Sequence, residues 1–580
     1  MAETAKVTVK DFDGNAVPYE GVKKVKLNTA DGETQIFSKG TAVENVPITL
    51  DFSSGDMSVT AEDDTLMKSV VIAKPENLVS ENIKKDEVVA GILGTHEGGG
   101  GTTSSFLSEE PWLDDVCFWD LEGNLIRNIP MNQIKNLTEL PTAPAYDNLI
   151  FECWNHTLEE ITSTECPLDI APIYSTADGK THVKISPYST STLAYKFNFT
   201  QTVENGVTFD FGDGSDPQTV AGTGAVYITH TFPSAGEYEI VISVEDGCVL
   251  GLSGGTSSAA FVMGATSTQA SSTAYAGRVT DLMVADGVEI NSCCIYYFYG
   301  LKFLSLPKTL KSIADYNFQS TAKLNCIAIP NGVTNVGKYV FRSLSDYSYG
   351  LCRKVISLPQ SVQTFGDECF SYSHKVERLV IPKNVTNFPY YGMYDGGKDL
   401  KRLFFKGDIK TAGAYSLQSL ISLNEFDFSK ISTTPSNFIK RIGVESLMIS
   451  SAVITIGNYF AEEAATKEVY IPSSVTTMGT YFMQNCYALK RVIFEDASTL
   501  TSIGSSFLYN SYNFVREIIF LSENLPTESI FKKIVEYSRR YAVYVPDGTV
   551  EAYKALPNNS YYYDIRPLSE YHGTIPGYND

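Results

Sequence analysis

Between residues 280 and 550, apolar and polar positions follow a pattern that recurs along the chain. Each copy has two apolar residues one position apart, then usually a proline, and then apolar residues three and six positions after that proline. Clear copies begin at Leu304, Ile327, Ile356, Leu379 and Val469. Such a period predicts a solenoid, in which each repeat stacks on its neighbours and the row displays an extended surface.

The repeat unit has the length of a leucine-rich repeat, which is about 20–29 residues. Pro307 and Pro330 are 23 residues apart, and so are Pro359 and Pro382. Because alternate side chains of an extended chain share one face, the apolar-x-apolar element predicts a strand with one side in the core. Proline has no N–H to give to a ladder, so it predicts the corner where each strand ends.

Other positions indicate what lies between and beyond the strands. Phe318, Phe341 and Phe370 recur after the later apolar pair and predict aromatic plugs between coils. Residues 396–446 lack the proline and the glycine of the pattern and predict a bulge or kink. Residues 541–553 predict a last strand and a short amphipathic helix, which would cap the open end of the core.

The pattern resembles the BspA-like leucine-rich repeats of bacterial surface proteins and some bacteriophage structural proteins. The resemblance spans residues 278–568, and residues 478–492 follow the return segment of that family. It implies adhesion or protein recognition and supplies no catalytic residues. We therefore expect residues 251–568 to form a capped solenoid, followed by a tail at 569–580.

Residues 177–250 are expected to form a separate β-sandwich. Phe209 and Phe211 share a strand face, and the turn that follows contains glycines suited to positive φ. Tyr238 to Val244 alternates as a half-buried strand. Together these segments resemble a polycystic-kidney-disease (PKD) domain, which is immunoglobulin-like, and we interpret it as a spacer.

Residues 106–176 are expected to form a small α/β module. A hairpin turning at Gly123, a helix at Met131–Asn136 and a strand at Leu149–Trp154 are predicted. Similar segments precede PKD and BspA-like repeats in gut bacteria and their phages. Its tryptophan and phenylalanine residues are interpreted as core.

Residues 1–97 are rich in predicted strands, among them 6–9 and 22–27, and end with a recognisable sequence segment. The segment from Asn82 to Thr95 resembles one that is common in phage tail and fibre proteins, where it precedes a glycine-rich linker. Residues 98–105 are four glycines, two threonines and two serines. Such a flexible linker reaches roughly 15 Å. The predicted fold class is therefore mainly β and modular: N-terminal β domain, small α/β module, sandwich and solenoid.

Composition narrows the class of partner and location. The 580-residue chain is 43% hydrophobic but has no long apolar run, which predicts a multidomain protein without membrane insertion. No signal peptide is predicted in residues 1–30, which favours synthesis in a host cytoplasm over export. The net charge of -22 argues against nucleic acid, because such binding requires a cationic surface.

The candidate chemistry is sparse, and no catalytic residue, cofactor site or metal site is predicted. Asp210, Asp213 and Asp216 could suggest a cation site, but we prefer turn carboxylates bound to the backbone. Ser253 lies in a G-x-S-x-G sequence, which is the pattern of a nucleophile elbow. Such an elbow needs a strand before it and a helix after it, whereas Ser253 lies in a Gly/Ser/Thr/Ala-rich segment, so we do not interpret it as a nucleophile. His230 is interpreted as part of the sandwich edge.

Two further alternatives concern thiols and sugars. The ten cysteines have no zinc-like spacing, so free structural thiols are expected, with Cys369 and Cys486 at buried repeat positions. A polysaccharide depolymerase would need two carboxylates about 5–10 Å apart. The carboxylates of the repeats are scattered, so this activity ranks third among the functions considered.

Tyrosine is the residue that most suggests a binding face. The chain has 35 tyrosines, and several cluster after the second apolar pair of a repeat. A tyrosine offers a rigid apolar face and a hydroxyl, which suits recognition of proteins or sugars; packing between coils is the equal alternative. The candidate ligand-binding face comprises Tyr347, Tyr349, Tyr390, Tyr391, Tyr394, Tyr509 and Tyr512.

We predict a non-enzymatic virion protein of a bacteriophage, on the tail or capsid. Residues 1–97 would bind other virion proteins, and the solenoid would bind a host surface protein, mucus or a glycan. By analogy with phage appendages, a homo-oligomer, and a trimer in particular, is expected. A bacterial surface adhesin whose export signal is missing is the second hypothesis.

Overall fold

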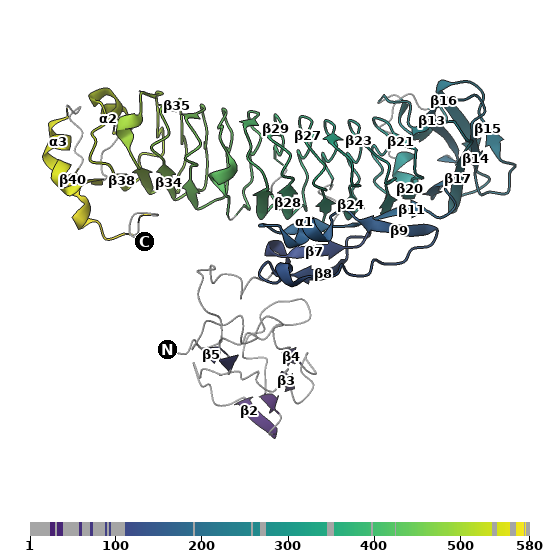
Figure 1. Cartoon of the computed structure of the whole chain (residues 1–580), viewed down its shortest axis with the longest axis horizontal. Coiled ribbons are helices and arrows are strands. Elements are labelled where there is room, and N and C mark those ends of the chain that lie inside the picture. The colour runs from purple at the N-terminus through teal and green to yellow at the C-terminus, as the bar shows by residue number, and fades with distance from the viewer. Residues whose placement is uncertain are drawn as a thin grey trace. The chain divides into compact units, whose positions relative to one another are not determined.

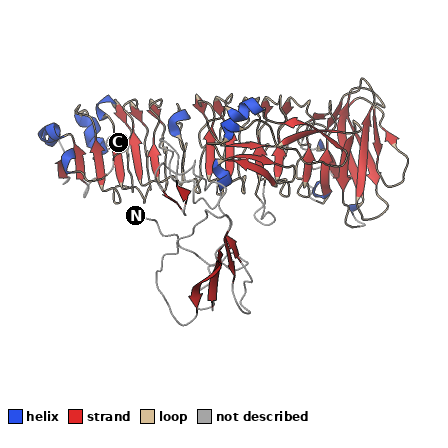
Figure 2. Ribbon diagram, turned by 60° about the horizontal axis from the view of Figure 1, so that its bottom comes forward, coloured by secondary structure: helices blue, strands red, loops and turns tan. Residues whose placement is uncertain are grey.

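The computed structural model divides the chain into two compact units, Met1–Pro111 and Trp112–Asp580 (Figure 1). In the first unit it describes the backbone of six strands. In the second it describes residues 112–575, with gaps at 190–191, 257–258, 267–273, 345–352, 396–397, 424, 536–541, 557–563 and 574. The mainly-β prediction is confirmed, since strands dominate and the helices are short (Figure 2).

The first unit contains a four-stranded antiparallel sheet in the order β2-β1-β3-β4 and a hairpin of β5 and β6. Its strands are β1 Lys24–Thr29, β2 Gly32–Ser38, β3 Met57–Thr60, β4 Val70–Ile72, β5 Val88–Val89 and β6 Ile92–Leu93. The strand expected at 22–27 overlaps β1. The one expected at 6–9 lies outside the described residues.

The second unit begins with the small module. The expected hairpin is present, since β7 and β8 are antiparallel and Gly123 between them has a φ of 85°. The expected helix at 131–136 is wrong, because only a 3₁₀ turn at Ile134–Asn136 forms there. The elements are β7 Val116–Trp119, β8 Leu125–Ile129, β9 Leu149–Trp154, α1 Leu158–Thr162, β10 Leu168–Ile170 and β11 Pro172–Thr176.

A sandwich of two sheets follows, and it continues into the solenoid. One sheet has the order β15-β14-β17-β12-β20-β22 and the other β16-β13-β18-β21, with β19 on β13. Strand β12 pairs with β20, which in turn pairs in parallel with β22 of the solenoid. The strands are β12 Thr181–Ile185, β13 Ala194–Gln201, β14 Val207–Asp210, β15 Gln218–Thr219, β16 Gly224–Thr231, β17 Tyr238–Val244, β18 Leu250–Leu252 and β19 Val262–Gly264.

The solenoid has one wall of longer strands that pair in parallel between successive coils. Each strand places alternate residues in the core, as the apolar-x-apolar pattern predicts, and a proline follows many of them. The wall comprises β20 Val279–Met283, β22 Phe303–Ser305, β24 Cys326–Ala328, β26 Val355–Ser357, β28 Arg378–Ile381, β30 Arg402–Phe405, β32 Ser446–Met448, β34 Glu468–Ile471, β36 Arg491–Phe494, β38 Glu517–Phe520, β39 Ala542–Val545 and β40 Asp564–Pro567.

A second wall consists of two-residue strands that also pair in parallel. They are β21 Glu289–Ile290, which pairs with β18, and β23 Ser312–Ile313, β25 Asn335–Val336, β27 Thr364–Phe365, β29 Asn387–Phe388, β31 Thr411–Ala412, β33 Thr455–Ile456, β35 Thr477–Met478 and β37 Ser502–Ile503. The last coils carry α2 Glu528–Ile534 and α3 Val550–Ala555. The strand and helix expected at 541–553 are therefore present as β39 and α3, but the strand is not the last, because β40 follows α3 and pairs with β39.

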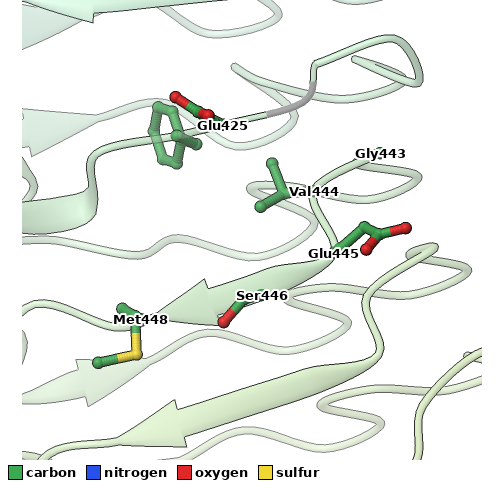
Figure 3. A pocket seen from close by; sticks show the side chains of 7 residues that line it. Glu425, Gly443, Val444, Glu445, Ser446 and Met448 are labelled. Carbon is green, nitrogen blue, oxygen red and sulfur yellow. The ribbon is translucent and has the colours of Figure 1, made fainter. Parts of the chain in front are cut away.

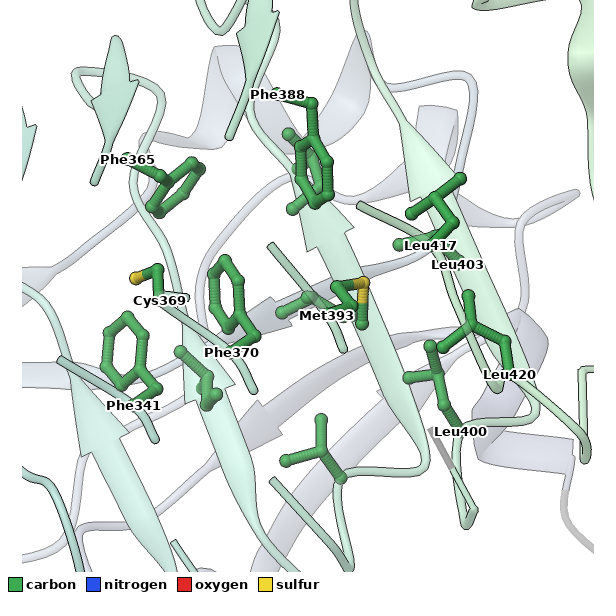
Figure 4. Close-up of a cluster of buried hydrophobic side chains, with 14 of the residues drawn as sticks. Phe341, Phe365, Cys369, Phe370, Phe388, Met393, Leu400, Leu403, Leu417 and Leu420 are labelled. Carbon is green, nitrogen blue, oxygen red and sulfur yellow. The ribbon is translucent and has the colours of Figure 1, made fainter. Parts of the chain in front are cut away.

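Stacked phenylalanines fill the core between the walls (Figure 4). The rings of Phe318, Phe341 and Phe370 are buried, with neighbouring centroids 5.9 and 5.2 Å apart. The expected aromatic plugs are thus confirmed. One continuous apolar cluster runs from Val183 in the sandwich to Tyr553 in α3. Sandwich and solenoid therefore share a core.

The strand ladder of the long-strand wall is broken between β22 and β24, between β26 and β28, and between β30 and β32, and the last break falls where the sequence pattern weakens. Strand β28 pairs with β30, and the next sheet begins at β32. Residues 425–427 lie between them without strand structure in the described chain, while the core beneath continues through Leu423 and Phe428. This last break falls within the region 396–446 that was expected to deviate.

The module packs on the outer side of this wall, which the sequence did not suggest. The fully buried guanidinium of Arg378 on β28 donates to Asp169 of β10, with Nε 3.0 Å from Oδ2. It also donates to the carbonyls of Trp112, Asp115 and Leu168. All three guanidinium nitrogens of this buried arginine donate hydrogen bonds to the module, and these bonds fix the module to the repeats.

Candidate ligand-binding face

Each coil makes a tight return turn after its short strand. A glycine usually starts the turn, because the preceding coil leaves no room for a side chain: a Cβ on Gly366 would lie 2.5 Å from the nitrogen of Lys338. Two positions later comes a residue in the left-handed region, with φ between 51° and 65°. We name this the ladder position; it holds Cys293, Tyr316, Tyr339, Glu368, Tyr391, Tyr415, Asn437, Tyr459, Tyr481 and Ser506.

The backbone at the ladder position links neighbouring coils. The N–H of Tyr316 donates to the carbonyl of Lys338, and that of Tyr459 donates to the carbonyl of Thr480, both at 2.9 Å. A left-handed conformation costs a non-glycine residue about 1–2 kcal/mol. The inter-coil bonds hold the chain in this conformation and set the register of successive turns.

Tyrosine rings at the ladder position stack along the solenoid in pairs. The centroids of Tyr316 and Tyr339 are 4.9 Å apart, those of Tyr391 and Tyr415 are 4.8 Å apart, and those of Tyr459 and Tyr481 are 4.9 Å apart. The interplanar angles are only 13–18°. All six side chains are partly exposed.

Three of the predicted site residues come together in the middle of this row. The ring centroid of Tyr391 lies 4.2 Å from that of Tyr390 and 4.9 Å from that of Tyr394. The ring planes are inclined by 74° and 86°. Tyr415 stacks on Tyr391, and Tyr372 lies 5.6 Å from Tyr394. The structure thus adds two tyrosines to the predicted cluster, and Tyr390 is 43% exposed at its edge.

The other predicted residues divide into two groups. Tyr509 is 40% exposed and stands at right angles to Tyr481, with the centroids 6.0 Å apart, and Tyr512 is partly exposed on the same turn. Tyr347 and Tyr349 lie outside the described residues.

Sequence reasoning missed the ladder tyrosines other than Tyr391. The signal was present, because each follows the corner glycine, or the residue replacing it, by two positions: Gly337 precedes Tyr339, and Gly457 precedes Tyr459. Clusters of adjacent tyrosines drew attention instead. The positive φ that distinguishes this position became visible only in the structure.

The surroundings of the ladder are polar but balanced in charge. Arg342 pairs with Glu368 at 3.4 Å, and Lys338 pairs with Asp367 at 3.6 Å. A hydrogen bond with Tyr390, together with burial, raises the pKa of the Tyr391 hydroxyl. The phenol therefore stays neutral near pH 7 and can donate or accept a hydrogen bond.

The residues weighed for catalysis or metal binding serve the backbone. Ser253 is buried at a φ of 78°, and its hydroxyl lies 2.7 Å from the carbonyl of Ser292 and 3.0 Å from that of Ala259. The carboxylate of Asp210 accepts a hydrogen bond from the N–H of Gly212, and that of Asp213 accepts one from the N–H of Ser215. Among the described residues, no group of acidic, histidine and cysteine side chains could hold a metal ion.

Other surfaces and segments add no chemistry. A shallow hollow lies at the last break of the long-strand wall, lined by Glu425, Glu445 and Met448 among others (Figure 3). The nine described cysteines are free, and Cys369 and Cys486 are buried as expected. Within the described part of the chain, no helix has the length and apolarity to cross a membrane.

Comparison with known families identifies the repeats. Three overlapping segments, residues 275–391, 343–463 and 433–539, match the BspA type leucine rich repeat region. The prediction of BspA-like repeats is therefore confirmed for this part of the chain. No curated protein matches the chain.

Three of the solved structures with some similarity are described as leucine-rich or leucine-rich repeat proteins. One from Bacteroides ovatus is 18% identical, with 50% of this chain and 84% of that chain covered and a TM-score of 0.29. One from Eubacterium ventriosum is 16% identical, with 55% and 80% covered and a TM-score of 0.26. A leucine rich cell surface protein from Faecalibacterium prausnitzii is 16% identical, with 50% and 83% covered and a TM-score of 0.24.

Proposed function

Because residues 275–539 carry BspA type repeats, we propose that the chain is a non-enzymatic adhesion protein that binds a host surface through its tyrosine ladder. One observation carries the proposal. Six tyrosines occupy the ladder position, although Glu368 and Asn437 occupy it with the same backbone conformation. The fold therefore tolerates polar residues there, and the tyrosines are available for recognition.

We further propose that the protein is displayed on a bacteriophage particle. The segment 82–95 and the glycine-rich linker after it resemble phage tail and fibre proteins. Residues 1–97 would then bind other tail or capsid proteins, with the sandwich, taken as a PKD-type domain, beside the repeats. A homo-oligomer, by analogy a trimer, would present several ladders at once.

Location is tested by labelling. Antibodies against the solenoid should decorate virions in electron micrographs, and deletion of residues 1–97 should remove the protein from purified particles. Labelling of the bacterial cell wall instead would make it a bacterial surface adhesin. Truncated protein that still copurifies with virions would exclude residues 1–97 as the attachment domain.

Adhesion is tested with the central cluster. Replacing Tyr390, Tyr391 and Tyr394 by serine should weaken binding to host cells about tenfold or more, because exposed aromatic anchors dominate such interfaces. Tyr227→Ser is the matched control, since Tyr227 is 61% exposed on the sandwich. Equal binding by both variants would reject the ladder as the binding face. Release of reducing sugar from host polysaccharide would reject a non-enzymatic role.

A further inference from the structure

The tyrosines of the ladder have an order of their own. The first ladder position holds the buried Cys293, and along the nine coils after it the position reads Tyr, Tyr, Glu, Tyr, Tyr, Asn, Tyr, Tyr, Ser. Two tyrosines and one polar residue thus repeat three times. The period is three coils, three times as long as the repeat that builds the fold.

Packing does not impose this longer period. Glu368 and Asn437 have φ values of 57°, within the range of the tyrosines. Their N–H groups donate to Tyr390 and Asn458 of the next coil, as the ladder tyrosines donate to theirs. The backbone of the coil therefore does not require the three-coil order. This leaves the order available for a role in recognition.

Each pair also has a third tyrosine at its side. Tyr296 lies 6.1 Å from Tyr316, Tyr390 lies 6.2 Å from Tyr415, and Tyr509 lies 6.0 Å from Tyr481. All three are tilted by 73–90° from their partners. We name each stacked pair with its third ring a tyrosine block.

The chemistry of a block suits a sugar. Stacked rings cover much of one another's faces and leave edges and hydroxyls for a ligand, and the third ring adds another phenol that is strongly tilted from the pair. Phenol hydroxyls both donate and accept hydrogen bonds, as sugar hydroxyls do. Glu368 between the first two blocks is paired with Arg342, so the ladder offers no concentrated charge there.

We propose that the ladder binds a linear, repeating polysaccharide laid along the solenoid axis, one repeat unit on each block. Parallel strands are about 4.8 Å apart, so three coils set a repeat of about 14 Å, a few sugars long. The three stacked pairs occupy the same ladder position at a regular three-coil spacing, although their third rings come from different positions of the turn. Such a regular row matches a repeating ligand, which a folded protein partner does not offer. Occupying three blocks with one chain makes the later contacts intramolecular, so affinity rises with chain length. This inference rests on the proposed adhesion function and specifies its ligand.

The first experiment uses cells to which the full-length protein binds. Periodate, which cleaves the vicinal diols of sugars, should abolish binding, and protease treatment of the cells should leave it intact. Binding that is sensitive to protease but resistant to periodate would refute a polysaccharide ligand, and the proposed adhesion function would still hold. Failure to bind any strain of a broad panel would overturn both.

The second experiment tests the three-block register. Polysaccharide extracted from the bound strain and sized by chain length should compete for the protein. Fragments spanning three repeat units should compete at least about 100-fold better than single units, since each further block engages intramolecularly. Competition that is independent of length would overturn the register.

Variants localise the effect. The double variant Tyr391→Asn/Tyr415→Asn replaces one pair by asparagine, the residue that occupies the ladder position at Asn437. It should weaken binding of the extracted polysaccharide about tenfold. The double variant Tyr459→Asn/Tyr481→Asn should have a similar effect, because this pair occupies the same ladder position. Tyr227→Asn on the sandwich should have none, and circular dichroism should be unchanged in all three. Unaltered binding by both pair variants would refute the proposal.

Discussion

At the scale of single residues, several buried polar groups of the described chain hold turns and interfaces in place. His230 shows the pattern, because its ring stacks on Phe211 at 3.8 Å and its Nε2 lies 2.8 Å from Oδ2 of Asp213. Burial raises the pKa of Asp213, but hydrogen bonds from Ser215 and His230 outweigh it and lower the pKa to about 2. The folded protein therefore stabilises the charged form of Asp213 relative to the unfolded chain.

Asp213→Asn should destabilise the protein by about 1–2 kcal/mol at pH 7, because it removes this charge-assisted bonding. A carboxyl with a lowered folded-state pKa contributes stability above its unfolded pKa of about 4, and this contribution is lost as the pH falls toward 2. The gap between wild type and variant should close over that range. Urea unfolding at several pH values measures it, and a constant gap would contradict the assignment.

Arg378 carries the second prediction at this scale. Arg378→Ala would leave Asp169 buried without its partner, and breaking a buried ion pair costs about 3–5 kcal/mol. We expect the module to detach from the repeats, seen as faster hydrogen exchange in β7 and β10. Arg566→Ala is the control, since Arg566 forms an exposed pair with Asp564. Unchanged exchange in Arg378→Ala would show that apolar contacts alone hold the module.

At the scale of elements, each coil separates what builds the stack from what faces outward. Neighbouring residues illustrate this: the Phe482 ring is buried between those of Phe460 and Phe507, with centroids 5.6 and 5.2 Å away, whereas Tyr481 is partly exposed on the ladder. One residue step along the turn moves a side chain from the core to the surface.

Phe482→Ala should therefore cost about 3–5 kcal/mol, as expected for removing a fully buried ring. Tyr481→Asn should change stability by less than about 1 kcal/mol, because asparagine tolerates the left-handed region. Chemical denaturation of the two variants compares them directly. Equal losses would mean that the ladder tyrosines are structural after all.

The elements also show what sequence could and could not foresee. Strands ending at proline and the plugs Phe341 and Phe370 were predictable, because they follow from local periodicity. The docking of the module through Arg378 was not, since an arginine at an outward strand position reads as solvent-exposed. The ladder was missed for a related reason: its positive φ arises from bonds to the next coil and leaves little trace in composition.

At the scale of the whole second unit, sandwich and solenoid form one folded body. Strand β12 pairs with both β17 and β20, so the sheet of the sandwich becomes the first wall of the repeats. Solenoids need a cover over the first open core face. The sandwich supplies it, as α2 and α3 do at the other end.

A fragment of residues 177–250 should consequently fail to fold. It lacks β20, which pairs with β12, and it lacks Phe261 and Val262, which are fully buried in the shared cluster. We expect poorly dispersed amide signals from the fragment. In the full chain, β12 and β17 should exchange hydrogen as slowly as β24 and β26, because one core unfolds as one unit. A well-folded fragment would show instead that the sandwich is an independent domain that merely abuts the repeats.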